Sequence, residues 1–381
     1  MDKKKFSLLL IFIFFGFGHF YRLNQQEFVG DEASPILLVD RAWEAIKFRD
    51  IKLAAFPFLW YHDPFRAVFA GSLIQLTGTD KIWLRLPGIF FSLAIYWLLV
   101  WIFKQEKISA AVTVLSLLAY SSAAVFLDYR LASGDSQGVF LILLAGYLIY
   151  KNSFRQAPWV LLAACLTMLD AVILIPVLVW KSKLRYWIRP GLIFVAYLFI
   201  WLALPYLAYR FGYQPWYENR GLWYYLSRVG EGVSVNPWLS LKALFHYSSY
   251  PFAVWLILSF VLSWFSRRLR RFQLITTPAW LAVFLLNRSS SHILMYVGLF
   301  FLQAVLVGQW LWQKNFLSKI IVSLILVLVS YFNGQQLYRH FIVSPLIIND
   351  QFIFGHFDVP RSGQEVDKAV KVLYQRYSTS K

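Results

Sequence analysis

Two adjacent acidic residues, Asp31 and Glu32, follow the first apolar segment and precede a sequence typical of a helix start. Ser34 is a favoured N-cap and Pro35 suits the first helical position, so both acids would stand at a fixed place beside a helix N-terminus. A carboxylate held there could accept the proton of an attacking hydroxyl. The simpler alternative is that the two acids only stabilise the helix through its dipole.

Three further groups of polar residues near apolar segments could complete a site of this kind. Histidine and arginine can neutralise the charge that grows on a departing phosphate, and the planar fork of arginine suits phosphate well. Each residue also has a structural alternative, because arginines can extend to lipid headgroups and polar residues can cap helices. The candidates are His62 and Asp63, then Arg85, then Tyr129, Arg130 and Asp135, with Arg288 and His292 ahead of a later apolar segment.

The composition places these residues in a membrane protein. Of the 381 residues, 59% are hydrophobic and only 15% are charged, whereas soluble domains carry about 25% charged residues. The net charge of +18 is distributed over short connections between apolar segments. That distribution indicates membrane orientation and not nucleic-acid binding, so we expect no nucleic-acid partner.

The apolar segments predict an all-α polytopic protein of about 10 to 11 transmembrane helices. The predicted spans are residues 6–23, 83–103, 108–127, 135–150, 187–209, 249–265, 274–286, 292–312 and 318–332. Residues 158–180 have basic residues on both flanks, which predicts a hairpin of two short helices turning near Leu169 and Asp170. Asp170 would then be either a structural residue at the hairpin tip or an ion site.

Charge distribution predicts which side of the membrane each connection occupies. The predicted inner segments contain only two acids, Asp2 and Glu106, so by the positive-inside rule the N-terminus is cytoplasmic and nearly all carboxylates face outward. The first outer loop, residues 24–82, would contain two helices along the membrane surface, at 35–48 and 64–77. The basic residues of the inner segments are Lys3, Lys4, Lys5, Lys104, Lys107, Lys151, Arg155, Lys181, Lys183, Arg185, Arg189, Arg267, Arg268, Arg270, Arg271, Lys314 and Lys319.

Taken together and in this order, the polar motifs resemble those of the GT-C superfamily of membrane glycosyltransferases. The resemblance is to the branch of protein O-mannosyltransferases and lipid A aminoarabinose transferases. It covers residues 28–150, and the remainder only as a pattern of spans. Asp63 stands where that branch usually has a proline, and no sizeable outer soluble domain is present. The matching motifs are Asp31-Glu32, His62-Asp63-Pro64, Arg85-Leu86-Pro87 and the run from Tyr129 to Asp135.

The resemblance implies a GT-C transmembrane domain over residues 1–332 and a short extracytoplasmic segment over 333–381. It implies an inverting transferase in a bacterial cytoplasmic membrane, with a polyprenyl-phosphate sugar as donor and a lipid, glycan or protein as acceptor. Asp31 would be the general base and Glu32 would assist it. The donor phosphate would be bound by Arg85, Arg130 and His62, with supporting roles for Asp135, Tyr129, Asp63, Arg288 and His292.

Two other classes of function stay open at this point. A transporter or flippase of a lipid-linked sugar would need charged residues along a path through the spans, where Asp170 is almost alone. A scaffold protein without enzymatic activity would have little use for paired acids at fixed positions. We expect no cofactor, since no His or Cys spacing indicates a structural metal, although a divalent ion bridging carboxylates and phosphate is an alternative.

Overall fold

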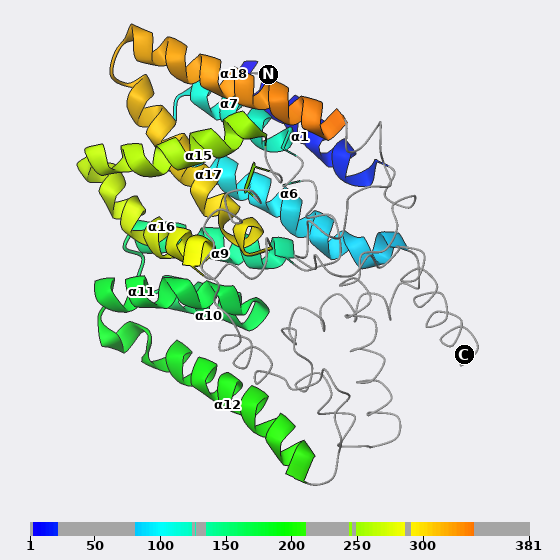
Figure 1. Ribbon diagram of the computed structural model, residues 1–381, viewed down its shortest axis with the longest axis vertical. Helices are drawn as coiled ribbons and strands as arrows, with labels where there is room; N and C mark the ends of the chain where they lie inside the picture. Colours follow the sequence, from blue (N-terminus) through cyan, green and yellow to red (C-terminus); the bar gives the residue numbers. More distant parts are fainter. Residues whose placement is uncertain are drawn as a thin grey trace.

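The computed structural model describes residues 3–21, 81–123, 126, 135–210, 244–245, 249–285 and 291–338. These residues form helices and no strands, which confirms the all-α class for this part of the chain (Figure 1). Three short 3-10 helices are η3 (Leu169–Leu174), η4 (Leu184–Tyr186) and η5 (Ser263–Phe265). The α-helices are α1 (Lys3–Phe20), α6 (Lys81–Gln105), α7 (Ala110–Ser121), α9 (Asp135–Tyr150), α10 (Ala157–Thr167), α11 (Ile175–Lys181), α12 (Ile188–Arg210), α15 (Tyr250–Leu262), α16 (Arg267–Leu285), α17 (Ser291–Trp312) and α18 (Phe316–Tyr338).

Three of these helices are long and apolar enough to cross a membrane. The apolar stretches are Arg85–Gln105 of α6, Met295–Trp312 of α17 and Phe316–Tyr338 of α18. Shorter apolar helices accompany them in α7, α9, α10, α12 and α15. The described part is therefore an all-α membrane protein by length and composition, and the number of ten or eleven spans stays a prediction.

The helices run between two ends of the bundle (Figure 1). At one end, which we call the basic end, short connections join α6 to α7, α9 to α10, α11 to α12, α15 to α16 and α17 to α18. At the other end, the distal end, α6, α9, α15 and α17 begin and α1, α7, α12, α16 and α18 finish. All the basic residues assigned above to inner segments belong to the basic end.

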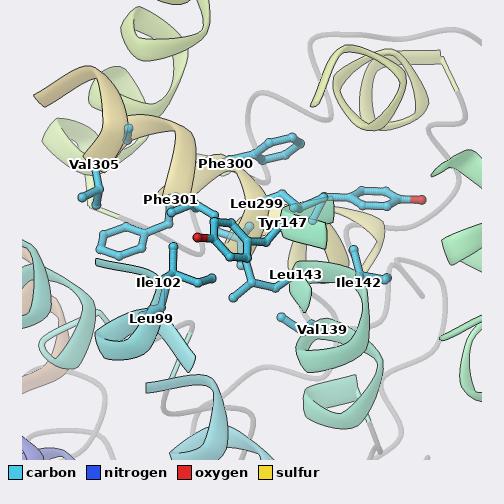
Figure 2. Close-up of a cluster of buried hydrophobic side chains, with 14 of the residues drawn as sticks. Leu99, Ile102, Val139, Ile142, Leu143, Tyr147, Leu299, Phe300, Phe301 and Val305 are labelled. Carbon is cyan, nitrogen blue, oxygen red and sulfur yellow. The ribbon is translucent and has the colours of Figure 1, made fainter. Parts of the chain in front are cut away.

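The centre of the bundle is formed by α9 and α17. Helix α9 packs against α6, α10 and α17, and α17 packs in turn against α15, α16 and α18. Residues 295–309 of α17 are all buried, as expected for a helix that is apolar on every side. Figure 2 shows Leu99 and Ile102 of α6 meeting Leu143 of α9 and Leu299 of α17 in this core.

Two glycines of α9 allow neighbouring elements to approach it closely. A Cβ atom at Gly146 would lie 2.5 Å from Cδ2 of Leu299 in α17, and one at Gly138 would lie 2.9 Å from Sδ of Met168. Small residues serve membrane helices in this way because lipid provides no hydrophobic drive for helices to associate, so close packing must supply the attraction. The positions of α17 and of the α10–η3 turn therefore depend on these glycines.

The predicted hairpin over residues 158–180 is confirmed. Helix α10 stops at Thr167, and Met168 takes an extended backbone conformation with φ −157° and ψ 116°. The chain then reverses through η3, and α11 packs back against α10. The segment therefore enters and leaves at the basic end, as its two basic flanks predicted.

Three predicted span limits differ from the ends of the helices. Helix α7 ends at Ser121, and not near residue 127. Helix α16 begins at Arg267, and not near residue 274, because arginine is a good helix former whose long side chain reaches solvent from a helical position. Helix α18 continues to Tyr338 and does not end at residue 332. The buried Asn333 explains this, since it accepts a hydrogen bond from Ser249 and donates one of 3.0 Å to the carbonyl oxygen of Ala119.

A buried carboxylate holds three elements together at the basic end. Oε1 of Glu106 accepts hydrogen bonds of 3.0 Å from Lys151 and 3.0 Å from the Tyr147 hydroxyl. Oε2 accepts a hydrogen bond of 2.9 Å from Arg268. The α6–α7 connection is thereby tied to the end of α9 and the start of α16. The charge pattern of the sequence predicts the end at which Glu106 lies but does not predict these partners.

Replacing Glu106 by glutamine should lower the free energy of unfolding by about 1–3 kcal/mol at neutral pH, because the buried Tyr147 hydroxyl and two cations lose a charged acceptor. Burial alone would raise the pKa of Glu106, but hydrogen bonds from Lys151, Tyr147 and Arg268, with the charge of Lys151, hold this pKa below its ordinary value of 4.5. A lowered pKa in the folded state stabilises the fold fully above the unfolded pKa, and this contribution is lost as the pH falls through the folded pKa.

Thermal unfolding of the detergent-solubilised protein between pH 7 and pH 3 would test this expectation. The difference between wild type and Glu106→Gln should be largest at neutral pH and should shrink below about pH 4.5. Lys104→Gln, at an exposed position on the preceding turn, is the control. Equal stability of Glu106→Gln and wild type at pH 7 would show that the cluster contributes nothing.

Candidate functional site at the distal end

Three of the residues predicted to do chemistry lie in described helices, and all three are near helix starts. Arg85 is in the first turns of α6, Asp135 is the first residue of α9 and His292 is the second residue of α17. The side chains of Asp135 and His292 are not among those described. The remaining predicted residues lie outside the described part of the chain: Asp31, Glu32, His62, Asp63, Tyr129, Arg130 and Arg288.

The side chain of Arg85 is fully buried, with 0% of its surface exposed. Arg85 lies two helical turns from Ser92 and four from Leu99, on the stripe of α6 that faces the core. The guanidinium is therefore enclosed by protein, and the alternative that Arg85 extends outward to lipid headgroups is wrong. Burying a charge in a membrane domain costs several kcal/mol unless it is compensated, so intramembrane cations are commonly functional.

A series of hydrogen bonds between buried side chains at the distal end holds α6 in the rotation that directs Arg85 into the protein interior. Nδ1 of His19 donates to the carbonyl oxygen of Phe15 at 2.8 Å, and Nε2 is hydrogen-bonded to Oγ of Ser92 at 2.8 Å. The Ser92 hydroxyl donates to the carbonyl oxygen of Phe126 at 3.1 Å. His19 and Ser92 are both fully buried. These hydrogen bonds were not predicted from the sequence, although a histidine within the apolar first span is a signal for them.

Helices α6, α9 and α17 run in the same direction, so all three begin at the distal end (Figure 1). Phe91 contacts Phe140 at a ring-centroid distance of 5.9 Å, and Trp101 contacts Tyr147 at 5.4 Å, which aligns α6 with α9 at two levels. A Cβ atom at Gly298 of α17 would lie 3.3 Å from Val139 of α9. The helix starts that carry Arg85, Asp135 and His292 therefore all lie at the distal end, where the positive ends of the helix dipoles are.

The hairpin tip also reaches the distal end. Met168 lies against Gly138, one turn into α9, and the Tyr296 hydroxyl of α17 donates to the carbonyl oxygen of Asp170 at 2.8 Å. Tyr296 is one helical turn from His292. Asp170 thus lies toward the distal end of the bundle, and its position in the sequence did not determine this location.

Chemically, this arrangement suits an anionic group. An enclosed guanidinium lies at the same end of the bundle as the starts of α6, α9 and α17, and both features favour phosphate. The hydroxyl of Ser136, in the first turn of α9, is 1% exposed and has no hydrogen-bond partner among the described residues. Within the described ranges, no three His, Cys, Asp or Glu residues are grouped as metal ligands would be.

Comparison of the chain with protein-family models, with curated proteins and with solved structures finds no match.

Proposed function

We propose that the chain is an inverting glycosyltransferase that moves a sugar from a polyprenyl-phosphate carrier to an acceptor hydroxyl or phosphate at the outer face of the membrane. The observation that carries this proposal is the complete burial of Arg85 at the distal end. An enclosed guanidinium at the end of the bundle where α6, α9 and α17 begin is well suited to a lipid-linked phosphate.

In the proposed reaction, the acceptor oxygen attacks the anomeric carbon on the face opposite the phosphate. The bond between this carbon and the phosphate oxygen breaks, its electron pair leaves with polyprenyl phosphate, and the configuration at the carbon inverts. Asp31 takes the proton of an acceptor hydroxyl, and Glu32 positions the acceptor. Arg85, with Arg130 and His62, stabilises the charge on the leaving phosphate.

The proposal includes a GT-C arrangement of the spans in a bacterial cytoplasmic membrane, with the distal end facing outward. Support comes from most basic residues of the described part, which occupy the opposite end, the exceptions being Lys81, Arg85 and Arg210. The described charges within apolar helices also favour transfer over transport. Arg85 and Asp170 both lie at the distal end, whereas a transporter would place functional charges along a path between the two ends.

Incubation of the purified, reconstituted protein with a labelled polyprenyl-phosphate sugar tests the proposal. Cleavage of the donor should give labelled acceptor or, with water as acceptor, labelled free sugar, together with polyprenyl phosphate. Movement of intact donor between leaflets without cleavage would identify a transporter and overturn the proposal. Neither cleavage nor movement across a panel of donor sugars would favour a scaffold.

A further inference from the structure

A cluster of cations to which the described residues supply no counter-ion lies at the basic end. Lys181, the last residue of α11, directs its ammonium group to α16, where it donates to the carbonyl oxygen of Arg271 at 3.4 Å. Burial, followed by the charge of Arg271, holds the pKa of Lys181 below its ordinary value. The fold thus holds the Lys181 ammonium at the backbone of Arg271, so two like charges lie near each other, an arrangement that an anion would stabilise.

A second pair of cations surrounds a tyrosine on the α11–α12 connection. Arg185 donates to the Tyr186 hydroxyl at 2.9 Å, and its guanidinium lies 4.9 Å from the centre of the tyrosine ring. The hydrogen bond and charge of Arg185, followed by those of Arg155, hold the pKa of Tyr186 below its ordinary value of 10.0. Three connections far apart in sequence, at residues 151–156, 182–187 and the start of α16, therefore contribute positive charge.

The described part of the chain supplies no carboxylate for these cations. Its acidic residues are Asp135 and Asp170 at the distal end and Glu106 at the basic end. Both oxygens of Glu106 are already occupied by Lys151, Tyr147 and Arg268. Positive charge therefore accumulates around Lys181 without compensation from described residues.

Exposed apolar side chains flank the cations and indicate a lipid rather than a soluble anion. Trp180 is 70% exposed, Leu184 57% and Phe265 70%. Aromatic and aliphatic side chains beside lysine and arginine are typical of the boundary between headgroups and acyl chains. A free phosphate ion would gain nothing from this apolar border, whereas a phospholipid would use both parts.

We propose that Lys181 and Arg271, assisted by Arg155 and Arg185, bind the headgroup phosphate of an anionic phospholipid in the leaflet at the basic end. Basic pockets between helices are known to be suited to such headgroups. The bound lipid would bridge α11 and α16 and would stabilise the hairpin against the bundle. This site lies at the opposite end from the proposed transfer site, and it does not depend on the proposed function.

The test uses the full-length protein in detergent, with phosphatidylglycerol or phosphatidylcholine added at equal mole fraction. Phosphatidylglycerol should raise the unfolding temperature by about 4 °C and phosphatidylcholine by much less, as for a ligand near 100 times its Kd. Native mass spectrometry should show retained phosphatidylglycerol. Lys181→Gln combined with Arg271→Gln should abolish at least half of the temperature shift, and Lys181→Arg should keep it.

The control removes two exposed cations elsewhere at the basic end, by Lys314→Gln combined with Lys319→Gln. The control should retain the wild-type response. The proposal is overturned if wild type responds equally to both lipids, or if both double variants lose the response to the same extent. It is also overturned if inorganic phosphate alone reproduces the full shift.

Discussion

Arg85→Gln should reduce sugar transfer from the lipid donor by about 10²–10³-fold, the loss typical for a positioned group that stabilises charge on a leaving oxygen. The side chain is enclosed at the distal end, so its charge acts in a region of low dielectric, where it is worth more than in water. The loss should appear in kcat and not only in the KM for the donor, because the charge on the phosphate grows as the bond breaks.

The variant Arg85→Lys separates the effect of the charge from that of the guanidinium geometry, and a second variant is its control. Arg85→Lys keeps the charge but loses the planar fork, so we expect activity between those of wild type and Arg85→Gln. Arg189→Gln removes an exposed arginine at the basic end and is the control. Unfolding temperatures should accompany each rate, since the side chain is buried. A folded Arg85→Gln protein with wild-type kcat would contradict the role of Arg85 in binding phosphate.

Asp31→Asn should reduce transfer by about 10²–10⁴-fold, because asparagine has nearly the same shape but cannot accept the acceptor proton. The wild-type rate should rise with pH as the base loses its proton, and this rise should disappear in the variant. Glu32→Gln should have a smaller effect and should preserve the pH dependence. The measurement is donor cleavage across pH, with protein level and membrane insertion checked.

Asp40→Asn, on the predicted surface helix that follows, is the matched control and should leave the rate unchanged. Near wild-type transfer by Asp31→Asn would rule out this residue as the base. If Arg85→Gln were impaired at the same time, phosphate binding would stand and another group would have to take the proton. The two variants thus test separate parts of the mechanism.

Local properties of the sequence were sufficient to predict much of the fold. The length of each apolar run and the charges on its flanks predicted α9 at residues 135–150 and the hairpin between two basic connections, and both are confirmed. Helix formation and membrane orientation depend on neighbouring residues and on the energy of placing charge in lipid, so they can be read from short windows of sequence. Helix limits set by tertiary hydrogen bonds, such as those of Asn333, could not be read in this way.

The sequence by itself determined an all-α membrane protein and singled out Arg85 and Asp135 as candidates for a site. Only the tertiary structure decided that Arg85 is enclosed and that the hairpin tip with Asp170 reaches the helix starts of α9 and α17. It also paired Glu106 with Lys151 and Arg268. The physical reason is that burial and ion pairing depend on which helices become neighbours, and that choice arises from packing between segments far apart in the chain.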